Sequence, residues 1–550
     1  MMVPAMAAVD EKTIKITGLA EGDNVKYYKV IEWTDSGWAF VSPFDTLTDD
    51  QKKQITGYKG PDPDDPTKQK VVEGIINDTL AAAMAGKVTS STATIGEDTL
   101  AAGVTEWSKS NVAPGLYMAL ITAAAPKVGK DMVVYNPVFM AVQADNTGSE
   151  VGLPKNYDQN GTAKKSTVTL DKTTHSAGDT EWVKATTEDV GDIIDYKIET
   201  TIPAYLDSWT NPLFTVSDTL SSGLTFAVKE GEGDAALTDI TVSGETAGEM
   251  QAGTQYTVTE KTASTFTIKF SDTYLKGRVA AEKVTITYKA KITADAKNVN
   301  PETNTATLTY DRNPNDSNDH GTKEDKTKHY TFDIDAGLNG NDSYTTSEIV
   351  KVAVDEAGNP ITAEKTYSNT SKHHPLAGAE FEIFTDEGCT THYTNSTITE
   401  TTKFTSSDMG LLNIKGLDEG TYYLKETKAA PGGYMLLTEK LKFVIEAVYD
   451  DVAATDTCNA YKVLKSYTVK TYTSKDEYQT AIESSYTMDN GTVEKVGTPT
   501  DRSREVENTK GLSLPSTGGM GTTLLYVGGS ILVILAAILL ITKRRMNAED

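Results

Sequence analysis

The sequence is poor in cysteine, histidine and basic side chains. Two cysteines in 550 residues, Cys389 and Cys458, are too few for a zinc ribbon or a disulfide-dense scaffold. The six histidines suggest no catalytic triad, and the chain has no nucleophile elbow, zinc-protease motif or phosphate-binding glycine loop. Acidic residues outnumber basic ones by 78 to 52, and a net charge of −26 excludes nucleic acid as a partner, because its phosphates are bound by Lys and Arg. These absences argue against an enzyme, a metal site and a cofactor.

Apolar residues are nevertheless sufficient for packed cores, at 38% hydrophobic and 8% aromatic. Threonine and tyrosine are abundant, and short alternating runs bounded by Gly, Pro and Asn favour β-strands. One short helix is expected near residues 71–85. At about 150 residues per domain, the length predicts three or four domains. We predict an all-β, elongated chain of tandem immunoglobulin-like β-sandwich domains.

Changes of composition divide the chain into regions. A β-rich N-terminal domain is expected at residues 9–150, a second domain at 160–320 and a third at 329–510, with linkers rich in Asn, Asp, Pro and Gly. Residues 1–8 contain Ala5-Met6-Ala7, which looks like the end of a signal peptide. The export of such a chain is consistent with its C-terminal sequence.

The C-terminal part, residues 514–550, contains an uncharged apolar run from Thr522 to Thr542. At about 1.5 Å per residue a helix of this length spans roughly 30 Å, the hydrocarbon thickness of a bilayer. Lys543-Arg544-Arg545 follows directly and holds that end in the cytoplasm. The run therefore predicts a transmembrane helix, with the preceding chain outside the cell; the alternative is a buried core helix.

Three polar side chains fall on apolar strand faces in the second domain. Because side chains alternate along a strand, Lys172, Asp218 and Asn304 each share a face with apolar neighbours. Buried unpaired charges are costly, so such groups shift their pKa and become neutral. A neutral amine can attack an asparagine amide whose carbonyl a protonated carboxyl polarises, which releases ammonia and forms an isopeptide bond. The residues alone leave open a buried ion pair beside a hydrogen-bonded asparagine.

The residues before the apolar run read Leu514-Pro515-Ser516-Thr517-Gly518. Together with the apolar run and the basic end, they resemble the sorting signal of Gram-positive wall-anchored proteins. The resemblance implies that a sortase cysteine attacks the Thr517–Gly518 bond and that an amine resolves the resulting thioester. Residues 518–550 would then be absent from the mature protein, because the transmembrane helix is removed on anchoring.

The second and third domains also resemble known domains. Residues 166–320 resemble the isopeptide-forming middle domain of sortase-assembled fimbrial subunits, through motifs at Leu170-Asp171-Lys172, Ser217 to Leu224, and Asn304 followed by Tyr310. The third resembles a collagen-adhesin B-type, prealbumin-like domain, through Pro375 to Phe381, Gly416 to Tyr422, and Leu424-Lys425-Glu426-Thr427. The resemblance implies isopeptide bonds from Lys172 to Asn304, assisted by Asp218, and from Lys351 to Asn508, assisted by Glu426.

Strand alternation places Glu426 on the apolar face of its strand, as the resemblance implies, but leaves the face of Lys351 ambiguous. In each domain the lysine is expected on the first strand and the asparagine on the last. A pull on the chain would then pass through the cross-link. A disulfide between Cys389 and Cys458 is also expected in an extracellular domain, and two free buried cysteines are the alternative.

Between the first two domains, Leu153-Pro154-Lys155-Asn156 resembles the Tyr-Pro-Lys-Asn pilin motif of major pilins, although Leu153 stands where the family has an aromatic residue. The resemblance implies that the Lys155 amine of one copy receives the Thr517 carboxyl of the next. Such a head-to-tail contact never closes and builds a fibre. The alternative is an exposed linker lysine.

The sequence thus indicates a major (backbone) pilin in the cell wall and fimbrium of a Gram-positive bacterium. The expected partners are a pilin-polymerising sortase, a housekeeping sortase, identical subunits, ancillary pilins and peptidoglycan, and a host surface ligand is a further candidate. The alternative is a monomeric wall-anchored adhesin, or a tip or base pilin that binds a host ligand. That protein would share the domains and the sorting signal without using Lys155.

Overall fold

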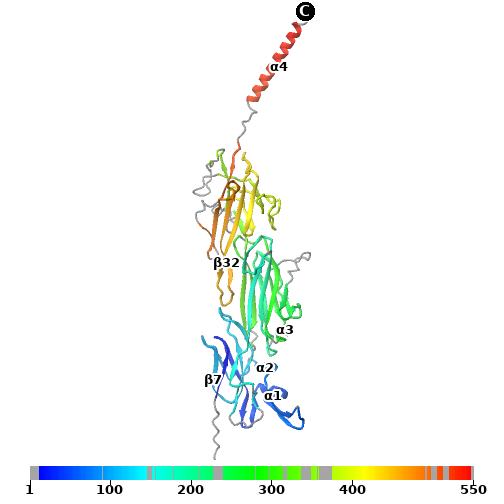
Figure 1. Cartoon of the computed structure of the whole chain (residues 1–550), viewed down its shortest axis with the longest axis vertical. Coiled ribbons are helices and arrows are strands. Elements are labelled where there is room, and N and C mark those ends of the chain that lie inside the picture. The colour runs from blue at the N-terminus through cyan, green and yellow to red at the C-terminus, as the bar shows by residue number, and fades with distance from the viewer. Residues whose placement is uncertain are drawn as a thin grey trace, which may run out of the picture.

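Three β-rich regions follow one another along the long axis of the molecule (Figure 1). The computed structural model describes residues 12–62, 64–89, 91–144, 152–154, 156–176, 179–209, 211–226, 240–278, 280–296, 298–313, 319–335, 348–355, 357, 359, 374–489, 492–496, 504–511 and 520–546. Strands far outnumber helices in these ranges. The prediction of an all-β chain of tandem domains is confirmed.

The first region packs two cores on the two faces of one sheet. Its strands are β1 (Lys12–Thr17), β2 (Asn24–Thr34), β3 (Gly37–Phe40), β4 (Gly57–Pro61), β5 (Gln69–Glu73), β6 (Gly96–Thr99), β7 (Glu106–Val112), β8 (Gly115–Thr122), β9 (Met132–Tyr135), β10 (Val138–Val142) and β11 (Asn160–Thr162). The central sheet has the order β10-β8-β2-β3. Along β8, Tyr117 packs into one core and its neighbour Met118 into the other, as alternation requires.

Two helices, α1 (Asp49–Thr56) and α2 (Asp78–Ala85), accompany this sheet. The Asn77 side chain caps α2 by accepting a hydrogen bond from Leu80 N, and Leu80 and Met84 pack into the second core. Only the second half of the segment 71–85 is therefore helical, because its first residues, 71–73, belong to β5.

The first two regions exchange strands across the expected linker. β9 pairs with β12 of the middle region, while β11 pairs with β1 of the first. The strand before the linker is therefore held by the middle sheet, and the strand after it by the first region. This exchange ties the two regions together through backbone hydrogen bonds.

The middle region is a β-sandwich. Its strands are β12 (Lys165–His175), β13 (Ala185–Thr187), β14 (Ile193–Ile202), β15 (Phe214–Leu220), β16 (Leu224–Phe226), β17 (Thr241–Gly244), β18 (Gly248–Glu249), β19 (Tyr256–Thr259), β20 (Thr265–Phe270), β21 (Glu282–Ile292), β22 (Glu302–Asp311) and β23 (His320–Tyr330), with one helix, α3 (Asp272–Lys276). One sheet has the order β18-β17-β21-β14-β12-β9 and the other β13-β23-β22-β15-β20-β19. Buried and less buried residues alternate along β14, β21 and β22, so each strand contributes one face to the core.

The third region contains the longest hairpin. Its strands are β24 (Phe332–Ile334), β25 (Ile349–Val354), β26 (His374–Pro375), β27 (Glu380–Phe384), β28 (Phe404–Thr405), β29 (Ile414–Leu417), β30 (Gly420–Lys428), β31 (Lys440–Val452), β32 (Tyr461–Thr473), β33 (Ile482–Asp489), β34 (Thr492–Val496) and β35 (Arg504–Thr509). The main sheet runs β28-β27-β30-β31-β32-β33-β34, and a second sheet runs β26-β25-β35. The core of this region includes residues of both sheets.

The tip of the β31–β32 hairpin reaches the middle region (Figure 1). Asn459 Nδ2 donates to the carbonyl oxygen of Leu170 at 2.6 Å and to Asp325 Oδ2 at 3.1 Å. Asp456 at the same tip accepts a hydrogen bond from the backbone of Val128 in the first region. One hairpin of the third region thus contacts both regions before it.

The helix α4 (Met520–Met546) follows the third region. Its segment Tyr526–Arg544 has a mean hydropathy of 2.1 and is exposed in the isolated chain. It is long and apolar enough to cross a membrane, as expected for the C-terminal run.

Candidate functional site

The first candidate site joins the two sheets of the middle sandwich. Lys172 lies on β12 in one sheet, whereas Asp218 on β15 and Asn304 on β22 lie in the other. The three residues have no exposed surface. β15 and β22 are paired with Leu220 opposite Asn304, which brings the Asp218 and Asn304 side chains to neighbouring positions on the inner face.

The Lys172 nitrogen is held by two oxygens. Nζ lies 2.5 Å from Asp218 Oδ2 and donates a short hydrogen bond to the hydroxyl of Tyr288. That hydroxyl also accepts a hydrogen bond from Asn304 Nδ2 at 3.0 Å. The nitrogen stands 5.0 Å from the ring centres of both Tyr196 and Tyr288, which stack on each other. The amine and the amide are therefore held against the same hydroxyl.

Burial dominates the electrostatics of the pair. Desolvation lowers the pKa of Lys172 although the Asp218 charge opposes this shift. Desolvation likewise raises the pKa of Asp218 against the effect of Lys172. Both shifts favour a neutral amine beside a neutral carboxyl, the state in which an amine is nucleophilic.

Two oxygens of this site accept no hydrogen bond, Asp218 Oδ1 and Asn304 Oδ1. Unsatisfied buried polar atoms are rare and costly. A proton on Asp218 would allow its carboxyl to donate to the Asn304 carbonyl, which would satisfy both atoms. The same hydrogen bond would polarise the amide for attack by Lys172.

The second candidate site lies in the third region, between β25, β30 and β35. Lys351, Glu426 and Asn508 are each about 1% exposed. Lys351 Nζ lies 3.1 Å from Glu426 Oε1, and Asn508 Nδ2 donates to Glu426 Oε2 at 3.2 Å. β25 and β35 are parallel neighbours with Ala353 opposite Asn508, so the lysine and the asparagine come from adjacent strands. Burial lowers the pKa of Lys351 to about 8.

The backbone supplies the remaining contacts of this second site. Leu437 N donates to Glu426 Oε2 at 2.5 Å, and Asn508 Nδ2 donates to the carbonyl oxygen of Met435 at 2.6 Å. The ring centre of Phe381 lies 5.6 Å from the Lys351 nitrogen. Every residue of β25 is buried, which explains why alternation gave no answer for Lys351.

The two sites differ from the sequence prediction in two topological details. Lys351 lies on β25, which β24 precedes, so it is not on the first strand of its region. Asn508 lies on β35, the last strand of its region, as expected. Asn304 lies on β22, and β23 follows it. The strand β23 therefore lies outside the segment between Lys172 and Asn304.

The residues expected to link subunits lie outside the described residues. These are Lys155 and the sorting motif Leu514, Pro515, Ser516, Thr517 and Gly518.

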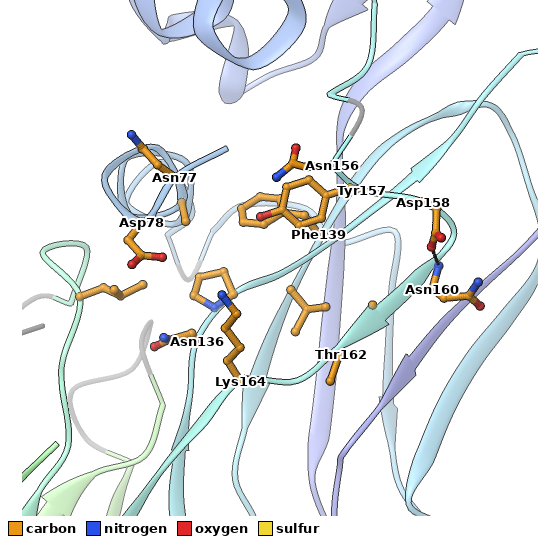
Figure 2. A pocket seen from close by; sticks show the side chains of 15 residues that line it. Asn77, Asp78, Asn136, Phe139, Asn156, Tyr157, Asp158, Asn160, Thr162 and Lys164 are labelled. Carbon is orange, nitrogen blue, oxygen red and sulfur yellow. Dashed lines mark hydrogen bonds between the residues drawn. The ribbon is translucent and has the colours of Figure 1, made fainter. Parts of the chain in front are cut away.

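The described neighbours of Lys155 pack against the first region. Leu153 is buried in its second core, which explains how an aliphatic residue satisfies a position where an aromatic one was expected. Tyr157, Asp78 and Lys164 help to line a cavity of about 430 Å³ beside this segment (Figure 2).

The expected disulfide between Cys389 and Cys458 is wrong, because both thiols are free and buried. Cys389 lies near Lys440 and Lys425 within the third region. Cys458 lies in the hairpin tip, where it is paired with Glu324 of the middle region. The two cysteines contact different parts of the molecule. Their presence in one predicted domain was therefore not enough to predict a disulfide.

No group of three or more His, Cys, Asp or Glu residues within the described ranges could hold a metal ion. Sequence reasoning missed Tyr288, which touches two members of the first site. Tyr288 follows Val284 and Ile286 on the inward face of β21, so the same alternation rule would have found it.

Comparison with known proteins agrees with this architecture. Residues 359–458 match the model of the SpaA prealbumin-like fold domain. The trypsin-resistant surface T6 protein of Streptococcus pyogenes serotype M6 is 26% identical over 469 residues, covering 78% of this chain and 79% of that protein. The solved T6 backbone pilin of the same serotype, described as a modular three-domain structure, is similar with a TM-score of 0.55 and 19% identity, covering 92% of this chain and all of that one. The chain is thus similar over most of its length to the T6 surface protein and shares the fold of the T6 backbone pilin.

Proposed function

We propose that the chain is the structural subunit of a covalent surface pilus. A sortase joins the Thr517 carboxyl of one copy to the Lys155 amine of the next. A housekeeping sortase then attaches the finished fibre to peptidoglycan, and ancillary pilins complete it. The polymerising reaction is the enzyme's, so the chain itself is a substrate.

Internal isopeptide bonds strengthen each subunit in this proposal. One joins Lys172 to Asn304 and the other joins Lys351 to Asn508. The observation that carries the proposal is the burial of two lysine, acid and asparagine trios in successive domains of a rod. Such cross-links suit a fibre subunit under tension, and the choice between that subunit and a wall-anchored adhesin depends on Lys155.

The chemistry at each site follows from its geometry. The carboxyl of Asp218 or Glu426 takes the lysine proton, and the neutral amine attacks the asparagine Cγ. The bond from Nζ to Cγ forms, a second proton passes from Nζ to Nδ2, and the bond from Cγ to Nδ2 breaks, so that ammonia leaves. The acid is restored, and each site reacts once in the life of the molecule.

Tandem mass spectrometry of wall-released, high-mass material tests the linkage between subunits. We expect a branched peptide that joins Thr517 to Lys155. Lys155→Arg keeps the charge and removes the amine nucleophile, so the ladder of polymers should disappear. Lys164→Arg, at the cavity beside the motif, is the matched control and should polymerise normally.

Two other outcomes would change the proposal. Thr517 found only on wall peptide, with Lys155 unmodified, would indicate a singly anchored adhesin or a basal pilin. A branched peptide at a different lysine would keep the pilus and reject Lys155.

A further inference from the structure

The Tyr288 hydroxyl contacts both reacting side chains of the middle site. Its oxygen accepts hydrogen bonds from Lys172 Nζ and from Asn304 Nδ2. In the isopeptide reaction the first of these nitrogens attacks and the second leaves. One oxygen therefore touches both the atom that must lose a proton and the atom that must gain one.

We propose that Tyr288 is a catalytic residue that relays a proton from Lys172 Nζ to Asn304 Nδ2, a role that rests on the isopeptide chemistry proposed above. The hydroxyl gives its proton to Nδ2 as it takes one from Nζ. The tyrosine is therefore unchanged when ammonia leaves.

The step balances without a further reactant. Attack of the neutral amine on Cγ gives a tetrahedral centre with a positively charged Nζ, while Asp218 donates its proton to Oδ1. The proton moves from Nζ through Tyr288 to Nδ2, which becomes ammonia. The bond from Cγ to Nδ2 then breaks, the carbonyl re-forms, and its proton returns to Asp218.

Solvent cannot perform this transfer in the folded domain. Lys172, Asp218 and Asn304 are fully buried, and Tyr288 is 2% exposed. A proton must therefore pass between side chains. Burial also raises the pKa of Tyr288 well above its usual value, which keeps the hydroxyl protonated and ready to donate.

The neighbouring tyrosine, Tyr196, also bonds outside the trio. The Tyr196 hydroxyl is hydrogen-bonded to His329 Nε2 at 2.8 Å, and His329 Nδ1 to Thr186. Tyr288 itself is fixed by stacking on Tyr196 and by an edge contact with Phe266. The ring is thus held in place while its hydroxyl is directed at the reacting nitrogens.

In the third-region site a carboxyl rather than a tyrosine contacts both nitrogens, because Glu426 Oε1 lies 3.1 Å from Lys351 Nζ and Oε2 accepts a hydrogen bond from Asn508 Nδ2. Asn508 Nδ2 donates to the Met435 carbonyl oxygen. A carbonyl can accept a hydrogen bond but has no proton to donate to a leaving amine. Among the described contacts, a tyrosine relay is therefore a property of the middle site, and each chain contains its own reference reaction.

Timed intact-mass measurement after cell-free synthesis of the full chain tests the relay. We expect Tyr288→Phe to slow the loss of ammonia at Lys172–Asn304 by roughly a hundredfold or more, because proton transfer by a placed side chain contributes on that scale. The Lys351–Asn508 reaction should keep its rate. Tyr205→Phe is the matched control, because it removes another buried hydroxyl of the same core that contacts Asp311 O and not the trio.

A second variant separates catalysis from packing, in case Tyr288→Phe does not fold. Site-specific 3-fluorotyrosine at position 288 keeps the ring and the hydroxyl but makes the phenol more acidic. The relay requires a changed rate at Lys172–Asn304 and an unchanged rate at Lys351–Asn508. An unchanged rate at both sites would overturn the relay and leave the isopeptide proposal intact. A parent chain that loses no ammonia would overturn the isopeptide proposal itself.

Discussion

The two candidate cross-links protect different shares of their domains. The segment from Lys351 to Asn508 ends on the last strand of its region, so almost the whole domain lies between the joined residues. The segment from Lys172 to Asn304 ends one strand early and leaves β23 outside. A covalent bond shields only the chain between its ends, so two sites with the same chemistry give different mechanical protection.

The environments of the two sites also differ. The middle site surrounds its lysine with Asp218 and two tyrosines, whereas the third-region site completes its contacts with the backbone of Met435 and Leu437. When the lysine is removed, the acid and the asparagine therefore keep different contacts in each domain.

The largest difference should appear under force. With both bonds formed, we expect the middle region to extend only by residues 305–330, up to about 90 Å at roughly 3.4 Å per residue. The segment 351–508 should not extend. Lys172→Ala should release the whole middle region, more than about 500 Å. Single-molecule pulling measures these steps, and a full-length middle step in the parent chain would contradict the cross-link.

Stability should fall in both lysine variants, and by unequal amounts. Closing a loop of this length contributes about 5 kcal/mol by chain entropy. Lys172→Ala also leaves Asp218 Oδ2 without its hydrogen bond from Lys172, which adds about 1–3 kcal/mol. In Lys351→Ala, Glu426 keeps its bonds from Leu437 N and Asn508 Nδ2, so the loss should stay near the loop value.

Guanidinium unfolding of each variant measures this difference. The control is Lys465→Ala, which removes an ion pair with Asp450 in which both side chains are exposed. Its effect on the free energy of unfolding should be below about 0.5 kcal/mol. Equal losses of unfolding free energy in the two lysine variants would show that the contacts which Asp218 and Glu426 keep do not affect stability.

The pH dependence of bond formation sharpens the comparison at the third-region site. The proposed reaction needs a proton that Lys351 brings to the pair. With the pKa of Lys351 lowered to about 8, that proton is lost above about pH 8, and the carboxylate can no longer donate to Asn508. The rate of ammonia loss should be flat below this pH and fall above it. A rate that rises through pH 8 would show that only the neutral amine is required.

A smaller effect is expected at the hairpin tip. Asn459→Ala removes the hydrogen bonds to Leu170 and Asp325 and should weaken the junction by about 1–2 kcal/mol. Faster proteolysis of the 453–460 loop would reveal the loosened contact. Thr457→Ala is the control, because only its backbone carbonyl contacts Glu324. Equal cleavage rates in the two variants would rule out a role for the Asn459 side chain.

The smallest effect concerns the thiols. Because Cys389 and Cys458 are both free, a reducing agent should leave the unfolding temperature unchanged. A lower unfolding temperature under reduction would show that a disulfide forms after all.

Strand alternation was sufficient to place the three polar residues of the middle site on inward faces, although it left open whether they form an ion pair or react. Lys172, Asp218 and Asn304 lie on strands whose residues alternate between core and surface, so a charge on the wrong face is visible in the sequence. The rule cannot resolve Lys351, because β25 is buried on both faces. Tyr288 escaped notice because an inward tyrosine looks like an ordinary core residue.

Other features depend on contacts between distant segments. The exchange of β9 and β11 between the first two regions follows no local pattern. The position of Cys458 likewise depends on how the hairpin tip docks on β23. Such pairings are set by tertiary packing, which propensity and periodicity do not encode.

Intact-mass measurement of the folded, purified chain tests the central claim most directly. The account predicts that the parent protein is lighter than its sequence by two ammonia molecules. Lys172→Ala and Lys351→Ala should each lack one of these losses, and the double variant should lack both. A parent mass equal to the sequence mass would contradict the account and leave two buried ion pairs in place of the cross-links.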